Sequence, residues 1–144
     1  MNKTLIILIL AALVLSWNFI FNSSEKVDFT DEAKILQGLS SAISYKTAIR
    51  KYWLEKGELP TAEAWQKIAN KPAIDISKSL VKTIDVGIEG PGMITVTFTN
   101  KDIINVAGDI EGKKITLKPV AIDGRLNWSC SGTLAKELLP KKCQ

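Results

Sequence analysis

Two cysteines near the C-terminus have the most easily defined chemistry in this sequence. Cys130 and Cys143 are separated by twelve residues. In an oxidising compartment they would form a disulfide, and closing a loop of this length would stabilise the fold by about 3 kcal/mol in the chain-entropy model. In a reducing cytosol they would be two unrelated thiols. The compartment, and therefore the N-terminal sequence, decides between these interpretations.

Lysines gather around the same part of the chain and could contact phosphate groups. The loop lysines are Lys136, Lys141 and Lys142, and an earlier group is Lys113, Lys114 and Lys118. Binding of nucleic acid needs positive charge, which agrees with this pattern and with the net charge of +4. No aromatic residue lies among the three loop lysines to stack on bases, which disfavours binding to single strands. Lysines that only solvate the surface are the alternative.

The loop between the cysteines is also the best candidate for a recognition surface. Its candidate contact residues are Ser131, Lys136, Glu137, Lys141 and Lys142. A solvated loop without a partner is the alternative interpretation.

Patterns typical of enzymes are absent. The chain has no histidine, which excludes His-based acid–base catalysis, Ser-His and Cys-His pairs and most catalytic zinc sites. It contains no phosphate-binding glycine loop, no nucleophile elbow, no C-x-x-C and no EF-hand spacing of acidic residues. We therefore expect no enzymatic activity, no cofactor and no metal site.

The N-terminal segment determines the compartment in which this loop lies. Residues 4–21 contain no charged side chain, and this length is at the lower end for crossing a hydrocarbon core of about 30 Å. Lys3 before the run, and Glu25 and Asp28 after it, favour an N-terminus on the inner side. A cleaved secretory signal is the alternative, although no small-residue cleavage site ends the run. Both interpretations place the rest of the chain outside the cytoplasm, which favours the disulfide.

The 144 residues are therefore divided into one domain and a membrane appendage. We expect a cytoplasmic stub at residues 1–3, a membrane-spanning helix at 4–21, a linker at 22–30 and a periplasmic domain at 31–144. The composition, 46% hydrophobic and 24% charged, is ordinary for a folded protein. The residues expected to anchor the helix in the bilayer are Leu5, Ile9, Ala12, Leu15 and Phe19.

A long amphipathic helix is predicted over residues 31–57. Apolar residues recur every three or four positions, which places them on one helix face. Thr30 is a candidate N-cap and Gly57 a candidate C-terminal cap. Such a helix would be about 39 Å long at 1.5 Å per residue. The apolar positions are Ile35, Leu39, Ala42, Tyr45, Ile49 and Tyr52, with Leu36, Ile43 and Trp53 widening the stripe.

Shorter elements follow this helix. Pro60 is a break, and residues 61–70 predict a short helix capped by Thr61. Apolar residues then alternate with polar ones at 83–88 and 94–99, which predicts a hairpin across the turn at 89–92 with Ile88 on its apolar face. Residues 114–120 and 125–130 predict two more strands joined by an Asp-Gly turn at 123–124, with Pro119 marking an edge or bulge.

Four antiparallel strands with one apolar face require a cover, and the 31–57 helix is the available partner. We therefore expect an α+β fold. In it a long, membrane-anchored N-terminal helix packs on a four-stranded antiparallel sheet, and a disulfide loop at residues 130–143 follows.

Three stretches, in this order, resemble type IV pilins over about residues 31–144. They are AISYKTAIRKYWLEKGELPTA, then INVAGDIEGKKITLKPV, then GRLNWSCSGTLAKELLPKKC, in which a Trp-x-Cys strand opens a loop closed by Leu-Pro-x-x-Cys. The resemblance implies a structural protein of the inner membrane that packs against pilins or the type IV pilus or secretion machinery. Small residues such as Ala11 and Ala12 would permit close approach of helices in the bilayer.

The first thirty residues differ from the family pattern. They contain no Gly-Phe step after a basic leader, and no acidic residue lies within the apolar run, since Glu25 comes after it. In the family, that acidic residue pairs with the N-terminal amine of a neighbouring subunit. We therefore expect a pilin-like protein retained in the inner membrane. The alternatives are a filament subunit of a cell-surface pilus whose start lies upstream of Met1, a module that binds DNA or a surface ligand, and a cleaved periplasmic domain.

Overall fold

The computed structural model describes residues 30–69, 71–73, 75–76, 79–100 and 109–144. The stub and anchor predicted at residues 1–21, with all five anchor residues, and the linker up to residue 29 lie outside the described residues. Within the described ranges, no helix combines the length and hydrophobicity needed to cross a bilayer.

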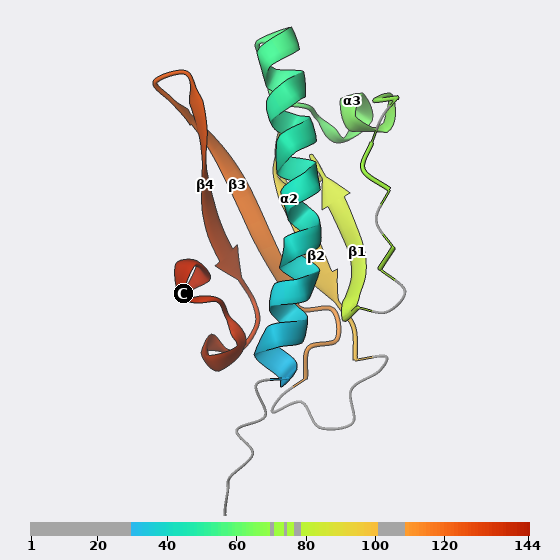
Figure 1. Ribbon diagram of the computed structural model, residues 1–144, viewed down its shortest axis with the longest axis vertical. Helices are drawn as coiled ribbons and strands as arrows, with labels where there is room; N and C mark the ends of the chain where they lie inside the picture. The colour runs from blue at the N-terminus through green and yellow to red at the C-terminus, as the bar shows by residue number, and fades with distance from the viewer. Residues whose placement is uncertain (1–29, 70, 74, 77–78, 101–108) are drawn as a thin grey trace, which may run out of the picture.

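Helix α2 (Thr30–Lys56) is the longest element, with 27 residues, or about 40 Å at 1.5 Å per residue. It lies lengthwise across one face of the sheet (Figure 1). Thr30 belongs to the helix itself, so the prediction that it is the N-cap was wrong. Gly57 ends the helix with φ +74°, and its N–H donates to Trp53 O at 2.8 Å. This left-handed residue is the predicted cap, since glycine alone adopts that backbone without strain.

The inner face of α2 is narrower than its sequence predicts. Ile35, Ala42 and Ile49 are completely buried, one every seven residues. Leu36 and Ile43 were expected to widen this face but are 45% and 62% exposed. The helix contacts a single sheet, so only one stripe along it can be covered.

A glycine sets how closely the helix approaches the sheet. A Cβ atom added to Gly38 would lie 2.6 Å from Val81 Cγ2 and 3.4 Å from Phe98 Cε1. The first separation is too short for two carbon atoms, so a side chain at position 38 would push α2 away from the sheet.

The sheet consists of β1 (Val81–Val86), β2 (Ile94–Phe98), β3 (Lys114–Ile122) and β4 (Arg125–Gly132). The strands lie in the order β1-β2-β3-β4, each antiparallel to its neighbour (Figure 1). This is the predicted four-stranded antiparallel sheet with the long helix on one face, so the expected fold class is confirmed.

The apolar positions predicted in β2 are buried, but Thr95 between them is buried too, and the edge strand β1 departs from the predicted alternation. Ile94, Val96 and Phe98 of β2 are completely buried against α2, as predicted. In β1 a bulge between Val81 and Thr83 shifts the alternation. Ile88 lies beyond the end of β1 and is 67% exposed, so its predicted place on the apolar face was wrong.

The β3–β4 hairpin extends beyond the rest of the sheet. Its two-residue turn has φ +49° at Asp123 and +69° at Gly124, as expected for the predicted Asp-Gly turn. Along β3, pairing with β2 ends at Leu117, whereas pairing with β4 continues to Ile122. Pro119 lies in this extension, where its missing N–H removes no bond to β2.

Helix α3 (Ala62–Gln66) is shorter than the predicted helix at 61–70. Thr61 is its N-cap, because its hydroxyl oxygen accepts a hydrogen bond from Ala64 N at 3.2 Å. Trp65 is buried, and its ring centroid lies 5.6 Å from that of Tyr45 on α2. This aromatic contact fixes α3 against the helix.

Candidate interaction surface

The C-terminal loop is closed by the expected disulfide. Cys130 lies near the end of β4, and Cys143 lies in the 3-10 turn η2 (Lys141–Cys143). Their Cα atoms are 4.5 Å apart and the two sulfur atoms are bonded. The disulfide ties the C-terminus of the chain to the last strand of the sheet.

Apolar side chains hold the inner side of this loop. Leu134, Leu138 and Leu139 are buried in the common core, and the turn η1 (Lys136–Leu138) contacts α2. A Cβ atom at Gly132 would lie 2.9 Å from the backbone oxygen of Lys114 and 2.7 Å from Leu139 Cδ2, so a side chain does not fit where the loop folds back over the strand. The loop is therefore an extension of the core rather than a solvated appendage.

The last residue adds polar contacts to the same loop. Gln144 Nε2 donates to the carbonyl oxygens of Lys136 and Leu139, each at 2.9 Å. These bonds connect the chain end to η1, so the backbone that presents the loop side chains is held in several places.

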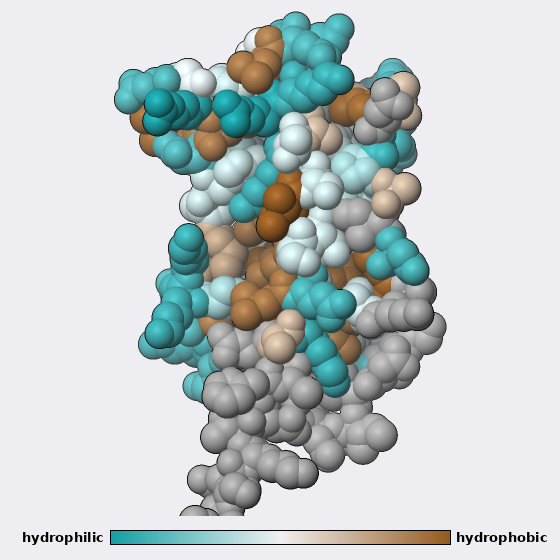
Figure 2. All heavy atoms as spheres, in the orientation of Figure 1, coloured by the Kyte–Doolittle hydropathy of each residue, from teal (hydrophilic) through white to brown (hydrophobic). Residues whose placement is uncertain are grey.

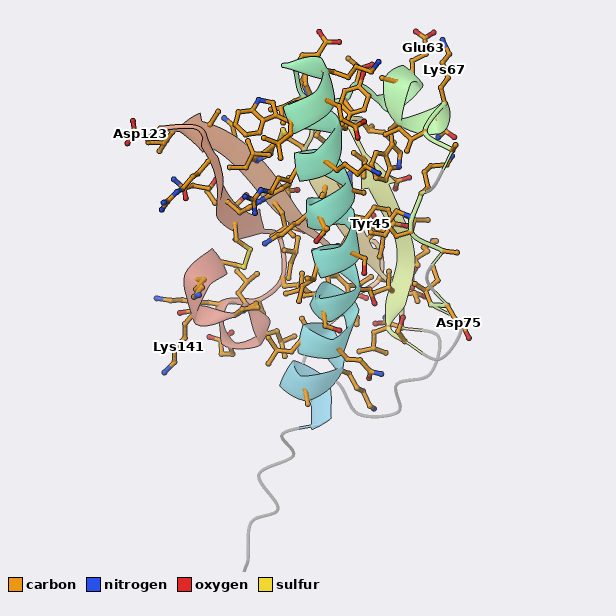
Figure 3. All side chains as sticks on the ribbon, turned by 45° about the horizontal axis from the view of Figure 1, so that its top comes forward. Tyr45, Glu63, Lys67, Asp75, Asp123 and Lys141 are labelled. Atoms are coloured by element: carbon orange, nitrogen blue, oxygen red, sulfur yellow. A yellow bond between two sulfur atoms is a disulfide. The ribbon has the colours of Figure 1, made fainter. Side chains whose placement is uncertain are left out.

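All five predicted recognition residues are exposed. Lys136 and Glu137 lie on η1, and Lys141 and Lys142 lie on η2. Lys141 points away from the body of the protein (Figure 3). Ser131 directly follows Cys130, which is bonded to Cys143 of η2, and successive residues of a strand point to opposite faces of the sheet. Ser131 therefore belongs to a different surface from the η1 and η2 residues. The role of these residues in recognition stays a prediction.

The earlier lysine group contains a residue that is already paired. Lys114 Nζ lies 3.2 Å from Glu89 Oε1, and Thr116 Oγ1 donates to Glu89 Oε2 at 3.0 Å. Partial burial opposes ionisation of Glu89, but hydrogen bonds from Thr116 and Lys114 outweigh it and lower the pKa of this carboxyl. Lys114 therefore does not add an uncompensated charge to the loop lysines.

A contact between α2 and β4 was not predicted. Lys46 Nζ lies 5.1 Å from the ring centroid of Trp128, a cation–π distance. Burial and then the positive charge of Lys142 lower the pKa of Lys46. Lys142 of the loop is thus close enough to α2 to affect the pKa of Lys46.

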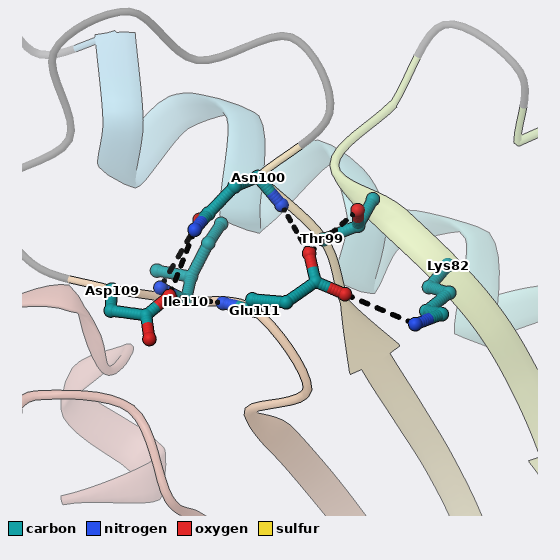
Figure 4. A network of polar contacts seen from close by, with 6 residues as sticks. All are labelled: Lys82, Thr99, Asn100, Asp109, Ile110 and Glu111. Carbon is teal, nitrogen blue, oxygen red and sulfur yellow. Dashed lines mark hydrogen bonds and ion pairs between the residues drawn. The ribbon is translucent and has the colours of Figure 1, made fainter.

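A polar network joins the chain on the two sides of residues 101–108 (Figure 4). Glu111 Oε2 accepts hydrogen bonds from Asn100 N and from Thr99 Oγ1, each at 2.9 Å, and Glu111 Oε1 lies 3.0 Å from Lys82 Nζ. The backbone N–H of Asn100, with Lys82 and Thr99, lowers the pKa of Glu111 to about 2. Asp109 Oδ1 accepts from Asn100 Nδ2 at 2.8 Å and from Glu111 N at 2.9 Å.

Sequence reasoning missed this network because its partners are separated along the chain. The only local signal is the pair of acidic residues at 109 and 111, which resembles any polar turn. Among the described residues, no group of acidic, cysteine or histidine side chains could hold a metal ion.

A groove lies between the C-terminal half of α2 and α3, and we call it the α2–α3 groove. Its volume is about 610 Å³. Two ion pairs lie on the border of the groove. On α2, Lys51 Nζ lies 3.9 Å from Glu55 Oε1, and on α3 and the residue after it, Lys67 Nζ lies 2.6 Å from Glu63 Oε1. The half-buried apolar residues of the groove are Ala48, Tyr52, Ala64 and Ile68, and the exposed charged ones are Lys51, Glu55, Lys56, Glu63 and Lys67.

The chain is similar to proteins of bacterial filaments. Fimbrial protein EcpC of Eikenella corrodens is 29% identical over 118 residues, which cover 81% of this chain and 72% of that protein. A fimbrial protein of Neisseria meningitidis serogroup A is 29% identical over 103 residues, 72% of this chain and 56% of that protein. The type IV major pilin protein PilE1 of Neisseria gonorrhoeae is 28% identical over 103 residues, 72% of this chain and 58% of that protein.

The matched region coincides with the fold described above. This chain spans somewhat more than half the length of the two Neisseria proteins. Residues 32–144, which include all but the first two residues of α2, the sheet and the disulfide loop, match the family described as pilin of the bacterial filament. The chain therefore belongs to the pilin family.

Proposed function

We propose that this protein is a pilin-type structural protein held in the bacterial inner membrane by residues 4–21. It packs laterally against pilins or against the type IV pilus or secretion machinery. The observation that carries this proposal is the face of α2 turned away from the sheet, which is uncovered and carries no charge over three helical turns.

The uncharged face is defined by exposure and residue type. Between residues 36 and 47, every exposed side chain of α2 is uncharged. The charged residue of this stretch, Lys46, is half-buried and lies over Trp128. In Figure 2, mostly pale and brown side chains run down the upper and central part of this face, and teal ones lie at its upper end, at its flanks and in its lower middle. The residues of the face are Leu36, Gln37, Ser40, Ile43, Ser44 and Thr47.

Two hydroxyl groups on this face bond to the helix itself. Ser40 Oγ donates to Gln37 O at 2.6 Å, and Thr47 Oγ1 donates to Ile43 O at 3.2 Å. These hydroxyls can lose water without leaving a donor unsatisfied, which lowers the cost of covering the face with another helix. The face therefore suits contact with an apolar helix of a neighbouring chain.

The position of this face along the chain supports the same partner. It begins a short distance after the uncharged run at 4–21, so neighbours that meet through that run in the bilayer would be close to α2 as well. The relatives are named as fimbrial proteins and a type IV major pilin, which supports assembly with similar chains.

A charge placed on the face tests the proposal. Ile43→Glu should strongly reduce the amount of pilin or assembly protein that co-purifies with the full-length chain from membranes, because burying an unpaired carboxylate is costly. Ile88→Glu, which makes the same change at an exposed isoleucine in the β1–β2 turn, is the matched control and should bind normally. Equal recovery of partners by both variants would contradict lateral packing through α2.

A filament subunit of a cell-surface pilus, with a role in adhesion or motility, is the second candidate, and the names of the relatives favour it. Intact mass and N-terminal sequence distinguish the two. A form that retains residues 1–21 and occurs only in membranes supports the retained accessory protein. A trimmed form recovered from sheared surface filaments would instead make this chain a filament subunit.

A further inference from the structure

Two complementary features lie at the same end of the molecule. The turn of the β3–β4 hairpin and helix α3 are on opposite sides of α2, both near its C-terminal end (Figure 1). Figure 3 shows Asp123 projecting from the hairpin on one side, and Glu63 and Lys67 on α3 on the other. A neighbouring copy standing parallel could therefore place its hairpin beside this copy's α3.

The hairpin end presents apolar and charged groups to solvent. We call residues 120–125 the hairpin tip. Val120 and Ile122 are 40% and 49% exposed, and Asp123 and Arg125 are also exposed. This part of β3 pairs with β4 alone, and a two-stranded ribbon receives little support in water. Contact with another surface would cover the two apolar side chains.

The α2–α3 groove offers apolar surface and charged side chains that complement those of the hairpin tip. Tyr52 and Ile68 supply half-buried apolar surface for an apolar side chain of the tip. Lysines on its border can receive Asp123, and the border glutamates can receive Arg125. The ion pairs already present there are exposed and therefore contribute little, so exchanging partners costs little.

We propose that the hairpin tip of one copy docks in the α2–α3 groove of a second copy of this chain. The proposal rests on the proposed function, because copies anchored in one membrane through the same end stand parallel and meet at equal heights. The two surfaces are different, so the contact is heterologous and can repeat from copy to copy among chains anchored in the membrane.

Photo-crosslinking in native membranes tests this contact. A benzophenone amino acid replaces Ile122 in the full-length chain, and irradiated membranes are analysed for crosslinked dimers. The expected product joins position 122 of one copy to a groove residue between positions 48 and 69 of another, identified in tryptic peptides. A crosslink from position 122 to lipid, to a different protein or to another region of the chain would overturn the proposal.

The same probe at Ile43 separates this proposal from the proposed function. Ile43 lies on the uncharged face of α2, so its crosslinks report lateral helix packing. Crosslinks from Ile43 without a groove product from Ile122 would overturn the tip–groove contact alone. Absence of crosslinks from both positions would count against both.

A charge variant sharpens the result. Asp123→Asn keeps the backbone preference for positive φ in the turn and removes only the charge. It should lower the yield of the groove product from position 122 by up to about fivefold, the range of an exposed ion pair. The yield from Ile43 should stay unchanged. An unaltered groove yield would exclude the assigned role of Asp123 opposite the lysines.

Discussion

The C-terminal loop and the segments that flank residues 101–108 are held together by different kinds of interaction. The C-terminal loop is joined by the Cys130–Cys143 disulfide and held by three buried leucines. The chain on the two sides of residues 101–108 is joined by hydrogen bonds of exposed polar groups around Glu111. The first closure depends on redox state and burial, whereas the second depends on the ionisation of carboxylates.

This difference has consequences for how each region responds to its surroundings. A covalent bond and apolar burial are insensitive to salt and to moderate acid. Protonation of a carboxylate removes its negative charge and weakens the hydrogen bonds and ion pairs that it accepts. The loop should therefore keep its conformation in acid, while the Glu111 network weakens.

Removal of the disulfide should have the largest effect. Replacing Cys130 and Cys143 together by serine should lower the free energy of unfolding by about 3 kcal/mol, because the unfolded chain gains freedom. Urea unfolding of the oxidised protein and of the double variant measures this difference. Wild-type protein unfolded in reductant should match the variant. A loss well below about 1 kcal/mol would mean that leucine packing alone closes the loop.

Truncation of a loop leucine should have the next largest effect. Leu138→Ala should cost about 2 kcal/mol in the oxidised protein, since it leaves a cavity beside α2. The same substitution should cost less in the variant without cysteines, where the loop is no longer held against the core. Lys136→Ala, in the same turn but exposed, is the control and should stay within about 0.5 kcal/mol. Equal costs of Leu138→Ala in both backgrounds would show that packing and disulfide act independently.

Glu111→Gln should change the pH dependence of stability. The pKa of Glu111 is about 2 in the folded protein and 4.5 in the reference state, so the folded state favours the ionised form. Its contribution is fully present above pH 4.5 and is lost as pH falls towards 2. The wild-type urea midpoint should therefore decrease more steeply over this window than that of the variant.

Glu58→Gln is the control for this measurement. Glu58 is an exposed carboxylate in the turn after α2, and its replacement should leave the steepness of the wild-type curve nearly intact. Parallel curves for wild type and Glu111→Gln between pH 4.5 and 2 would disprove the role of the network. Asp109, whose pKa is lowered by the N–H of Glu111 and the amide of Asn100, accounts for part of the remaining slope.

Structural features that depend only on residues close together in the sequence were predictable. Local backbone preference predicted the Gly57 cap, the Thr61 cap and the Asp123–Gly124 turn. A simple period predicted the buried apolar positions of β2. The predicted helix at 61–70 was too long because Lys67 N and Ile68 N bond to carbonyls three residues back, which ends α3 in a tighter turn.

Features of the candidate site were less predictable. The exposure of the five recognition residues follows from their polarity, but the separation of Ser131 from the others depends on the face of the sheet on which Cys130 bonds to Cys143 of η2. The α2–α3 groove is lined by residues of two helices, and the contact between the rings of Tyr45 and Trp65 joins those helices. A periodicity in one helix contains no information on such a partner.

The sequence by itself determined the element order, the family resemblance and the two cysteines that close the loop, because periodicity, turn residues and spacing are local properties. Only the tertiary structure decided which face of α2 remains exposed to solvent and that Glu111 accepts hydrogen bonds from Asn100 and Lys82. A single sheet covers a single stripe of a helix, and polar groups distant in the chain meet only when strands pair. The contacts available for assembly therefore depend on packing that no local pattern encodes.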